Sequence, residues 1–265
     1  MSAIGVFDSG VGGLTVFKEL IKQLPREDVV YFGDTARVPY GTKSRETIIR
    51  FSLENILFLL QKDVKIIVVA CNTSSSLALP TLRRHFKKPI IGVISPGAKE
   101  AVYATRNNRI GVIATSATIN SAAYAQEIKK LKPSAEIFSQ ACPLFVPLAE
   151  EGWVKEKVAV EIAEKYLASL KKVKVDTLIL GCTHYPLLKP VIKKVMGEGV
   201  RLIDSAQQVA QEVKQVLADE GLLSSDRKHQ AEYTFFVSDE PGNFQRLAKR
   251  FLGFSLNKVK RVKDV

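Results

Sequence analysis

Ile66-Ile67-Val68-Val69-Ala70-Cys71-Asn72-Thr73 and Thr177-Leu178-Ile179-Leu180-Gly181-Cys182-Thr183-His184 share one layout: an apolar run, a small residue, a cysteine and a short polar segment. A short apolar, β-branched run that ends in small and polar residues is typical of a buried parallel strand. Two such passages, with a cysteine at the same point of each, indicate a repeated structural unit.

Further apolar runs alternate with helical patterns along the chain. The predicted strands are Ile4–Phe7, Val29–Phe32, Ile66–Ala70, Ile90–Ile94, Ile110–Ala114, Ala135–Phe138, Thr177–Leu180, Leu202–Ile203 and Tyr233–Val237. Helical patterns between them include Leu14–Gln23, Ser44–Gln61 and Val158–Leu170. This alternation predicts an α/β fold with parallel sheets.

The first four runs can be laid in order on the next four. One spacing relates the first two pairs and a slightly longer spacing relates the last two, as a single small insertion would produce. We therefore predict two pseudo-symmetric parallel-sheet α/β lobes with the active site in the cleft between them. The first lobe is expected to comprise residues 1–97 and 206–265, and the second residues 98–205.

Composition and charge narrow the functional classes. The chain has 265 residues, 46% of them hydrophobic, and a formal net charge of +12. Basic residues are mixed with acidic ones and no nucleic-acid motif is present, so nucleic-acid binding is not expected. A positive field would instead attract an acidic small molecule. No apolar run reaches the roughly 20 residues of a membrane span, and no secretory signal is visible, so a cytoplasmic protein is expected.

Cysteine usage argues against a disulfide framework. The three cysteines, Cys71, Cys142 and Cys182, are few and odd in number, and they form no C-x-x-C motif. Reduced thiols are therefore expected, and these serve as packing, as metal ligands or as reactive bases. Cys142 lacks the context of the other two and is expected to be structural.

A glycine-rich turn follows the first strand, in Asp8-Ser9-Gly10-Val11-Gly12-Gly13. It matches neither the Walker loop nor G-x-G-x-x-G, because Thr15 stands where the third glycine belongs. The Asp8 carboxylate would repel phosphate and suits an ammonium group or proton transfer better. The alternative is that Asp8 only caps the helix that follows.

Cys71 and Cys182 stand at equivalent strand ends, where ligands of parallel α/β sheets gather. A lone cysteine is more often a small buried apolar residue, but this duplication favours a chemical role. A thiol at a helix N-terminus is expected to shift toward the thiolate, and His184 could stabilise or protonate the Cys182 sulfur. Two thiols across one cleft suit stereoinversion, which needs a base on one face of a carbon and an acid on the other. Asp8 and His184 would then tune the two thiols.

With these motifs, the chain closely resembles the glutamate racemases of the aspartate/glutamate racemase superfamily. The resemblance covers nearly the whole chain. Its motifs are Phe7–Leu14, Asp34–Ala36 with Pro39–Gly41, Ala70–Thr73 and Gly181–Leu187. Taken from the residues alone, Asp34–Gly41 is either a ligand-contacting loop or a connecting turn.

The resemblance implies interconversion of L- and D-glutamate, which supplies D-glutamate for peptidoglycan, without pyridoxal phosphate, metal or any other cofactor. It implies Cys71 and Cys182 as the proton-transfer residues, with Asp8 and His184 assisting. The substrate contacts that it implies are Asp8, Ser9, Tyr40, Gly41, Asn72, Thr73, Thr115, Thr118, Thr183 and His184. An acidic residue near the site corresponds to Glu150, beside Glu151. A homodimer is expected, and membrane association is not.

Three alternatives stay open at this point. The first is a zinc enzyme with Cys71, Cys182 and His184 as ligands and one open position. The second is a two-lobed amino-acid binder without catalysis. The third is a racemase that acts on aspartate instead of glutamate.

Overall fold

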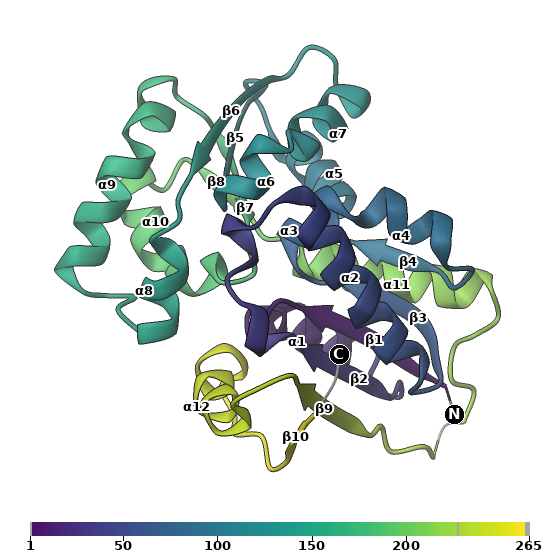
Figure 1. Ribbon diagram of the computed structural model, residues 1–265. Coiled ribbons are helices and arrows are strands. Elements are labelled where there is room, and N and C mark those ends of the chain that lie inside the picture. Colours follow the sequence, from purple (N-terminus) through teal and green to yellow (C-terminus); the bar gives the residue numbers. More distant parts are fainter. Residues whose placement is uncertain (1, 227, 263–265) are drawn as a thin grey trace.

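The apolar runs form two parallel β-sheets, each flanked by helices (Figure 1). This computed structural model describes residues 2–226 and 228–262. The first sheet has the strand order β10-β9-β2-β1-β3-β4. Its strands are β1 (Ala3–Asp8), β2 (Val29–Gly33), β3 (Val64–Val69), β4 (Ile90–Gly92), β9 (Tyr233–Val237) and β10 (Val259–Arg261).

The second sheet repeats the strand order β2-β1-β3-β4 of the first. Its order is β6-β5-β7-β8, and all of its pairings are parallel. The strands are β5 (Arg109–Ala114), β6 (Glu136–Ala141), β7 (Thr177–Gly181) and β8 (Arg201–Ile203). Because β6-β5-β7-β8 follows the same chain order as β2-β1-β3-β4, the prediction of two similar parallel-sheet lobes is confirmed.

Two strand predictions differ from the structure by two residues or more at their C-terminal ends. The run Ile90–Ile94 is a strand only to Gly92, since helix α5 (Ile94–Ala104) already begins at Ile94. The run Ala135–Phe138 becomes β6, which continues to Ala141. β6 pairs with β5 alone, so it lies at the edge of its sheet. Its half-exposed side chains give it a weak apolar signal.

Helices cover both faces of the sheets and supply the connections between parallel strands. The first lobe's sheet is flanked by α1 (Leu14–Gln23), α2 (Arg45–Leu60), α3 (Asn72–Leu77), α4 (Leu79–His85), α11 (Ala206–Asp219) and α12 (Pro241–Leu252). The second sheet is accompanied by α6 (Ser116–Asn120), α7 (Ala123–Leu131), α8 (Phe145–Glu151), α9 (Lys157–Lys172) and α10 (Lys189–Met196). Short 3₁₀ turns lie at η1 (Thr35–Arg37), η2 (Tyr40–Thr42) and η3 (Tyr185–Leu188).

One apolar core extends from the first sheet into the second. It includes Ile4 and Val6 of β1, Ile110 and Val112 of β5, and residues of α1, α5 and α11. Burial of apolar surface therefore holds the lobes together on one side, which leaves the carboxyl ends of the strands to form a cleft. The residues at which the chain passes from one lobe to the other stay a prediction.

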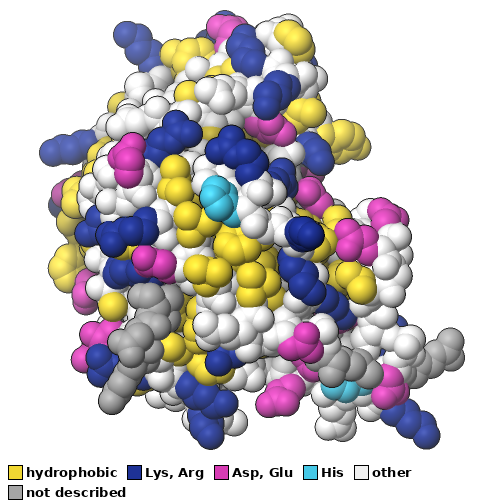
Figure 2. Space-filling view, turned by 45° about the vertical axis from the view of Figure 1, so that its right-hand side comes forward, with side chains coloured by type: hydrophobic (Ala, Val, Ile, Leu, Met, Phe, Trp, Pro, Cys, Tyr) yellow, Lys and Arg dark blue, Asp and Glu magenta, His cyan; other side chains and the backbone are white. Residues whose placement is uncertain are grey.

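Positive charge is spread over the face of the molecule drawn in Figure 2. Lys and Arg side chains lie in several places across this face, with Asp and Glu side chains among them. Apolar side chains gather in the middle of the same face. No helix within residues 2–226 and 228–262 is long and apolar enough to cross a membrane.

Candidate active site

Strand ends of both lobes meet at a cavity of about 350 Å³. Most residues predicted to contact a substrate line it, namely Ser9, Tyr40, Gly41, Cys71, Asn72, Thr73, Thr115, Glu150, Cys182, Thr183 and His184. Asp8 and Thr118 are not among the lining residues and lie behind them, almost fully buried. The cavity therefore collects side chains from β1, β3, β5 and β7, because parallel strands present their carboxyl ends on one side.

Cys71 sits at the N-cap of α3, directly beyond β3. Its side chain is buried, and burial together with the nearby Asp8 raises the pKa of the thiol to about 12. The expectation that the helix N-terminus shifts Cys71 toward the thiolate is therefore wrong for the resting protein. Loss of hydration outweighs what the six-residue helix α3 offers.

Cys182 begins a chain of polar contacts along the wall of the cavity. Its Sγ lies 3.9 Å from Nδ1 of His184, and Nε2 of the same ring lies 2.9 Å from Oε1 of Glu150. Burial lowers the pKa of His184, but its bonds to Cys182 and Glu150 prevail and raise the pKa to about 10. An imidazolium is thus available to the Cys182 sulfur at neutral pH. Glu151, by contrast, is exposed, so Glu150 is the acidic residue at the cavity.

Asp8 ends β1 as a fully buried carboxylate. It accepts a hydrogen bond from the Gly10 N–H at 2.9 Å and one from the Thr183 hydroxyl at 3.4 Å. Burial raises the pKa of Asp8, while His184 and these donors oppose that increase. Gly12 and Gly13 are required beside it, since a Cβ on Gly12 would lie 2.3 Å from Thr183 Oγ1 and one on Gly13 2.6 Å from Asp8 Cβ.

Three threonine hydroxyls join the lobes across the cleft. Thr73 Oγ1 of the first lobe lies 3.0 Å from Thr115 Oγ1 and 3.4 Å from Thr118 Oγ1 of the second. Thr115 also caps α6 by accepting from the Thr118 N–H at 3.4 Å. The neighbouring Gly41 lies against Thr115 so closely that a Cβ there would be 2.7 Å from Thr115 Cβ. This contact leaves no room for a side chain between the two lobes at position 41.

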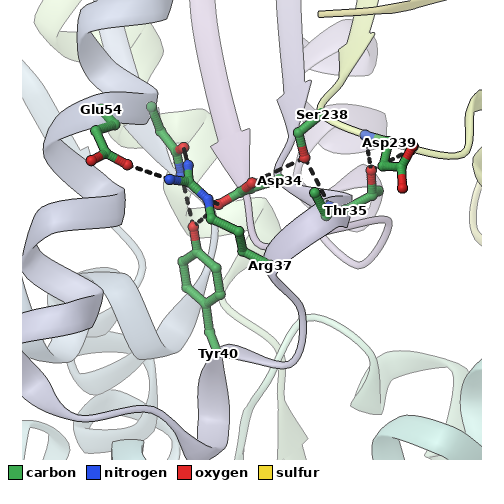
Figure 3. Close-up of polar contacts among 9 residues, drawn as sticks. Asp34, Thr35, Arg37, Tyr40, Glu54, Ser238 and Asp239 are labelled. Carbon is green, nitrogen blue, oxygen red and sulfur yellow. Dashed lines mark hydrogen bonds and ion pairs between the residues drawn. The ribbon is translucent and has the colours of Figure 1, made fainter. Parts of the chain in front are cut away.

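Tyr40 lines the cavity but directs its hydroxyl away from it, into the network of Figure 3. The hydroxyl donates to Asp34 Oδ2 and accepts from Asn55 Nδ2 at 3.1 Å. Arg37 binds Asp34 at 2.6 Å and also pairs with Glu54. The segment Asp34–Gly41 is therefore held by this network, in which the Tyr40 hydroxyl is already engaged. Asn72 is held similarly, as the Tyr124 hydroxyl donates to its Oδ1 at 2.7 Å.

Several residues around the site carry no local sequence signal. Pro143, Val146 and Pro147 form an apolar wall of the cavity. Phe251 of α12 packs edge-on against the His184 ring at a centroid distance of 5.4 Å, and Arg250 donates to the backbone carbonyl of Glu150. The helix Asn243–Phe251 was predicted as part of the first lobe, but its amphipathic pattern does not reveal that it packs against His184.

The proposed zinc ligands do not form a metal site. In the part of the chain that the structure describes, no three His, Cys, Asp and Glu side chains are grouped so that they could hold a metal ion. His184 already directs its two ring nitrogens to Cys182 and Glu150. The arrangement instead places two separate thiols, a buried carboxylate and an imidazole around one cavity.

Comparison with known proteins identifies the family. The model of the Asp/Glu/Hydantoin racemase family matches residues 4–213. A glutamate racemase of Geobacter metallireducens is 55% identical over 260 residues, which cover 98% of this chain and 96% of the relative. The chain is a member of the glutamate racemases, within the Asp/Glu/Hydantoin racemase family. It is therefore an amino-acid racemase, an isomerase.

Solved racemase structures share the fold. A glutamate racemase isoform from Bacillus anthracis superposes with a TM-score of 0.95 at 40% identity, covering 99% of this chain and 97% of the other. The Francisella tularensis glutamate racemase, solved in complex with D-glutamate, gives a TM-score of 0.92 at 41% identity, with the same coverage. The racemase fold expected from the sequence is thereby confirmed.

Proposed function

We propose that this racemase interconverts L- and D-glutamate by a two-base mechanism in which Cys71 and Cys182 transfer the protons and no cofactor takes part. The observation that carries this proposal is that the two cysteines line one cavity from equivalent strand ends of the two lobes. A stereocentre held between them would have one thiol on each face. One sulfur removes the α-proton while the other delivers a proton from the opposite side.

The two thiols have different surroundings. The raised pKa of Cys71 keeps this thiol protonated and ready to donate. The raised pKa of His184 keeps an imidazolium 3.9 Å from the Cys182 sulfur, where it stabilises negative charge. This state serves one direction of the reaction. The reverse direction requires the proton to move to Cys182 and Cys71 to act as the base, close to the buried Asp8.

Polar groups around the cavity suit a substrate with two carboxylates and one ammonium group. Ser9, Asn72, Thr73 and Thr183 offer neutral hydrogen-bonding groups from both lobes, and Asp8 supplies negative charge behind them. Prearranged donors in a site with little water are what a carbanion-like transition state needs without an electron-accepting cofactor. The complex of the Francisella tularensis relative with D-glutamate supports this choice of substrate.

The decisive experiment follows the optical rotation of L-glutamate by circular dichroism, with no added cofactor. We expect racemisation by the unmodified chain and a loss of at least about 10³-fold in Cys71→Ala and in Cys182→Ala. Cys142→Ala is the matched control, because Cys142 is buried but does not line the cavity. Full activity in either of the first two variants would overturn the two-thiol mechanism.

Parallel measurements separate the alternatives. Stoichiometric zinc in the purified protein, with activity lost to a chelator, would favour a metal enzyme. Faster turnover of aspartate than of glutamate would change the substrate. Absence of deuterium incorporation at Cα in D₂O, with binding retained, would indicate an amino-acid binder.

We further propose that the D-glutamate formed supplies peptidoglycan synthesis in the cytoplasm and that the chain works as a homodimer. Rescue of a D-glutamate-requiring bacterium by the unmodified chain, but not by Cys71→Ala, would support the first proposal, and failure to rescue would refute it. Sedimentation equilibrium at the mass of a single chain would refute the dimer.

A further inference from the structure

Ser74 carries a hydroxyl that the fold buries without a partner. The residue is fully buried, and its Oγ makes no hydrogen bond within residues 2–226 and 228–262. The hydroxyls of the two adjacent serines form hydrogen bonds to backbone groups. Ser75 Oγ donates to the Val69 carbonyl at 2.8 Å and accepts from the Val93 N–H at 3.2 Å, and Ser76 Oγ donates to the Thr73 carbonyl at 3.0 Å. A buried hydroxyl without a partner is unfavourable, so its place next to the site calls for a reason.

The helix geometry places this hydroxyl beside Cys71. Cys71 is the N-cap of α3, which makes Ser74 the third residue of the helix. In a capping box, the side chain at each of these two positions reaches the backbone N–H of the other, so the two positions lie close together across the first turn. Burial and Asp8 raise the pKa of Cys71, whereas the N–H and hydroxyl of Ser74 act in the opposite direction, as does the Ser9 hydroxyl.

The second lobe has no equivalent hydroxyl. The spacing that relates Cys71 to Cys182 relates Ser74 to Tyr185, whose hydroxyl donates to the Cys142 carbonyl at 2.8 Å. Cys182 has His184 at 3.9 Å instead. The two thiols therefore differ in the group available to compensate a negative sulfur.

We propose that Ser74 is a positioning residue whose hydroxyl donates to the Cys71 sulfur when that sulfur becomes a thiolate, and that no oxygen or nitrogen of the described residues bonds to it because it serves this state. The inference rests on the proposed role of Cys71 in racemisation. A thiol accepts hydrogen bonds weakly and a thiolate strongly. The hydroxyl therefore stabilises the thiolate of Cys71 relative to its thiol. The N-terminus of α3 alone does not offset the burial of this thiol.

The test measures the ionisation of Cys71 directly. Iodoacetamide alkylation of the Cys71 peptide is followed by mass spectrometry as a function of pH, which distinguishes Cys71 from the other cysteines. In Ser74→Ala we expect alkylation at pH 8 to be about tenfold slower, since one hydrogen bond to an ionised group is worth roughly one pKa unit. Alanine is smaller than serine and favours helix, so α3 should be retained.

Racemisation provides the second readout. Because L- and D-glutamate have equal free energy in solution, kcat/KM must fall by the same factor in both directions. We expect about tenfold in each, with KM little changed and the pH at half-maximal activity raised by about one unit. Ser52→Ala is the matched control, because Ser52 on α2 is also a fully buried hydroxyl without a partner in the described residues. It should leave both readouts unchanged.

An unaltered alkylation profile in Ser74→Ala would overturn the proposal, as would an equal shift in Ser52→Ala. A failure of the proposed function is recognised separately. In that case the unmodified chain does not racemise glutamate, while the alkylation of Cys71 still reports whether Ser74 acts on its sulfur.

Discussion

Oε1 of Glu150 lies 2.9 Å from Nε2 of His184, on the opposite side of the ring from the Cys182 sulfur. The Glu150 side chain is 37% exposed, whereas that of His184 is 7% exposed. The pair therefore connects a buried thiol to the outer part of the cleft through one imidazole ring. Glu150 holds the ring in orientation and stabilises its protonated form, so that its removal should affect both the pKa of His184 and the reaction.

The first prediction concerns stability against pH. The pKa of His184 is raised from 6.5 to about 10, so the folded chain binds this proton more tightly than the unfolded chain does. The resulting stabilisation is fully present below about pH 6.5 and is lost as the pH rises through about 10. The difference in Tm between the unmodified chain and His184→Gln should therefore shrink across this range. Thermal unfolding at several pH values checks this, and a difference that grows with pH would contradict it.

Substitution of Asp8 should raise the stability of the fold and lower the activity. Burial raises the pKa of Asp8 above 3.8, so the ionised carboxylate destabilises the fold at neutral pH, and this cost disappears below the unfolded pKa. Asp8→Asn should raise Tm at pH 7, with the gain vanishing near pH 4, and should lower kcat by about 10²-fold. Calorimetry together with the racemisation assay measures both. A lower Tm at pH 7 would show that hydrogen bonding, and not charge burial, governs this position.

Gly41 should be intolerant of any side chain. A Cβ there would approach Thr115 Cβ to 2.7 Å, so Gly41→Ala must push the lobes apart or distort the cavity. Misplacement of this order is expected to lower kcat/KM by about 10²-fold. Gly242→Ala is the control, since nothing lies within 4 Å of a Cβ at that position on α12. Equal activity of the two variants would mean that the Gly41–Thr115 contact does not set the geometry of the cleft.

Tyr40→Phe should affect stability rather than binding. Its hydroxyl donates to Asp34 and not into the cavity, so its removal deprives a buried carboxylate of one donor (Figure 3). We expect a loss of about 1–3 kcal/mol in the free energy of unfolding, with KM for glutamate nearly unchanged. Urea denaturation and steady-state kinetics provide the two values. A large rise in KM with unchanged stability would place the hydroxyl in contact with the substrate.

The fold was predictable because its signals are local. Each buried strand is an apolar run, and the cysteines after β3 and β7 mark equivalent points of two repeated units. The ends of the edge strand β6 were predicted less well, because its half-exposed residues do not form a continuous apolar run. The segments after β1, β2, β3 and β7 were expected at the site because ligands of parallel sheets gather at the carboxyl ends of the strands. Thr115 and Glu150 were expected there only from the resemblance to a known family.

The properties of the site residues were less predictable, because they depend on contacts distant in sequence. The protonation of Cys71 follows from burial and from Asp8, neither of which is visible in the residues next to it. The choice between Glu150 and Glu151 depends on which side of helix α8 faces the cavity. The role of Tyr40 depends on Asn55, which belongs to another helix.

The packing of Phe251 against His184 has a consequence for the order in which parts of the protein fold during synthesis. Phe251 is synthesised later than every residue that lines the cavity. Domains generally fold as units while the chain is still being made. Because α12 belongs to the core of the first sheet, that lobe is complete only after α12 has left the ribosome. The second sheet with Cys182 can form earlier, and until α12 arrives the His184 ring lacks the aromatic ring against which it packs.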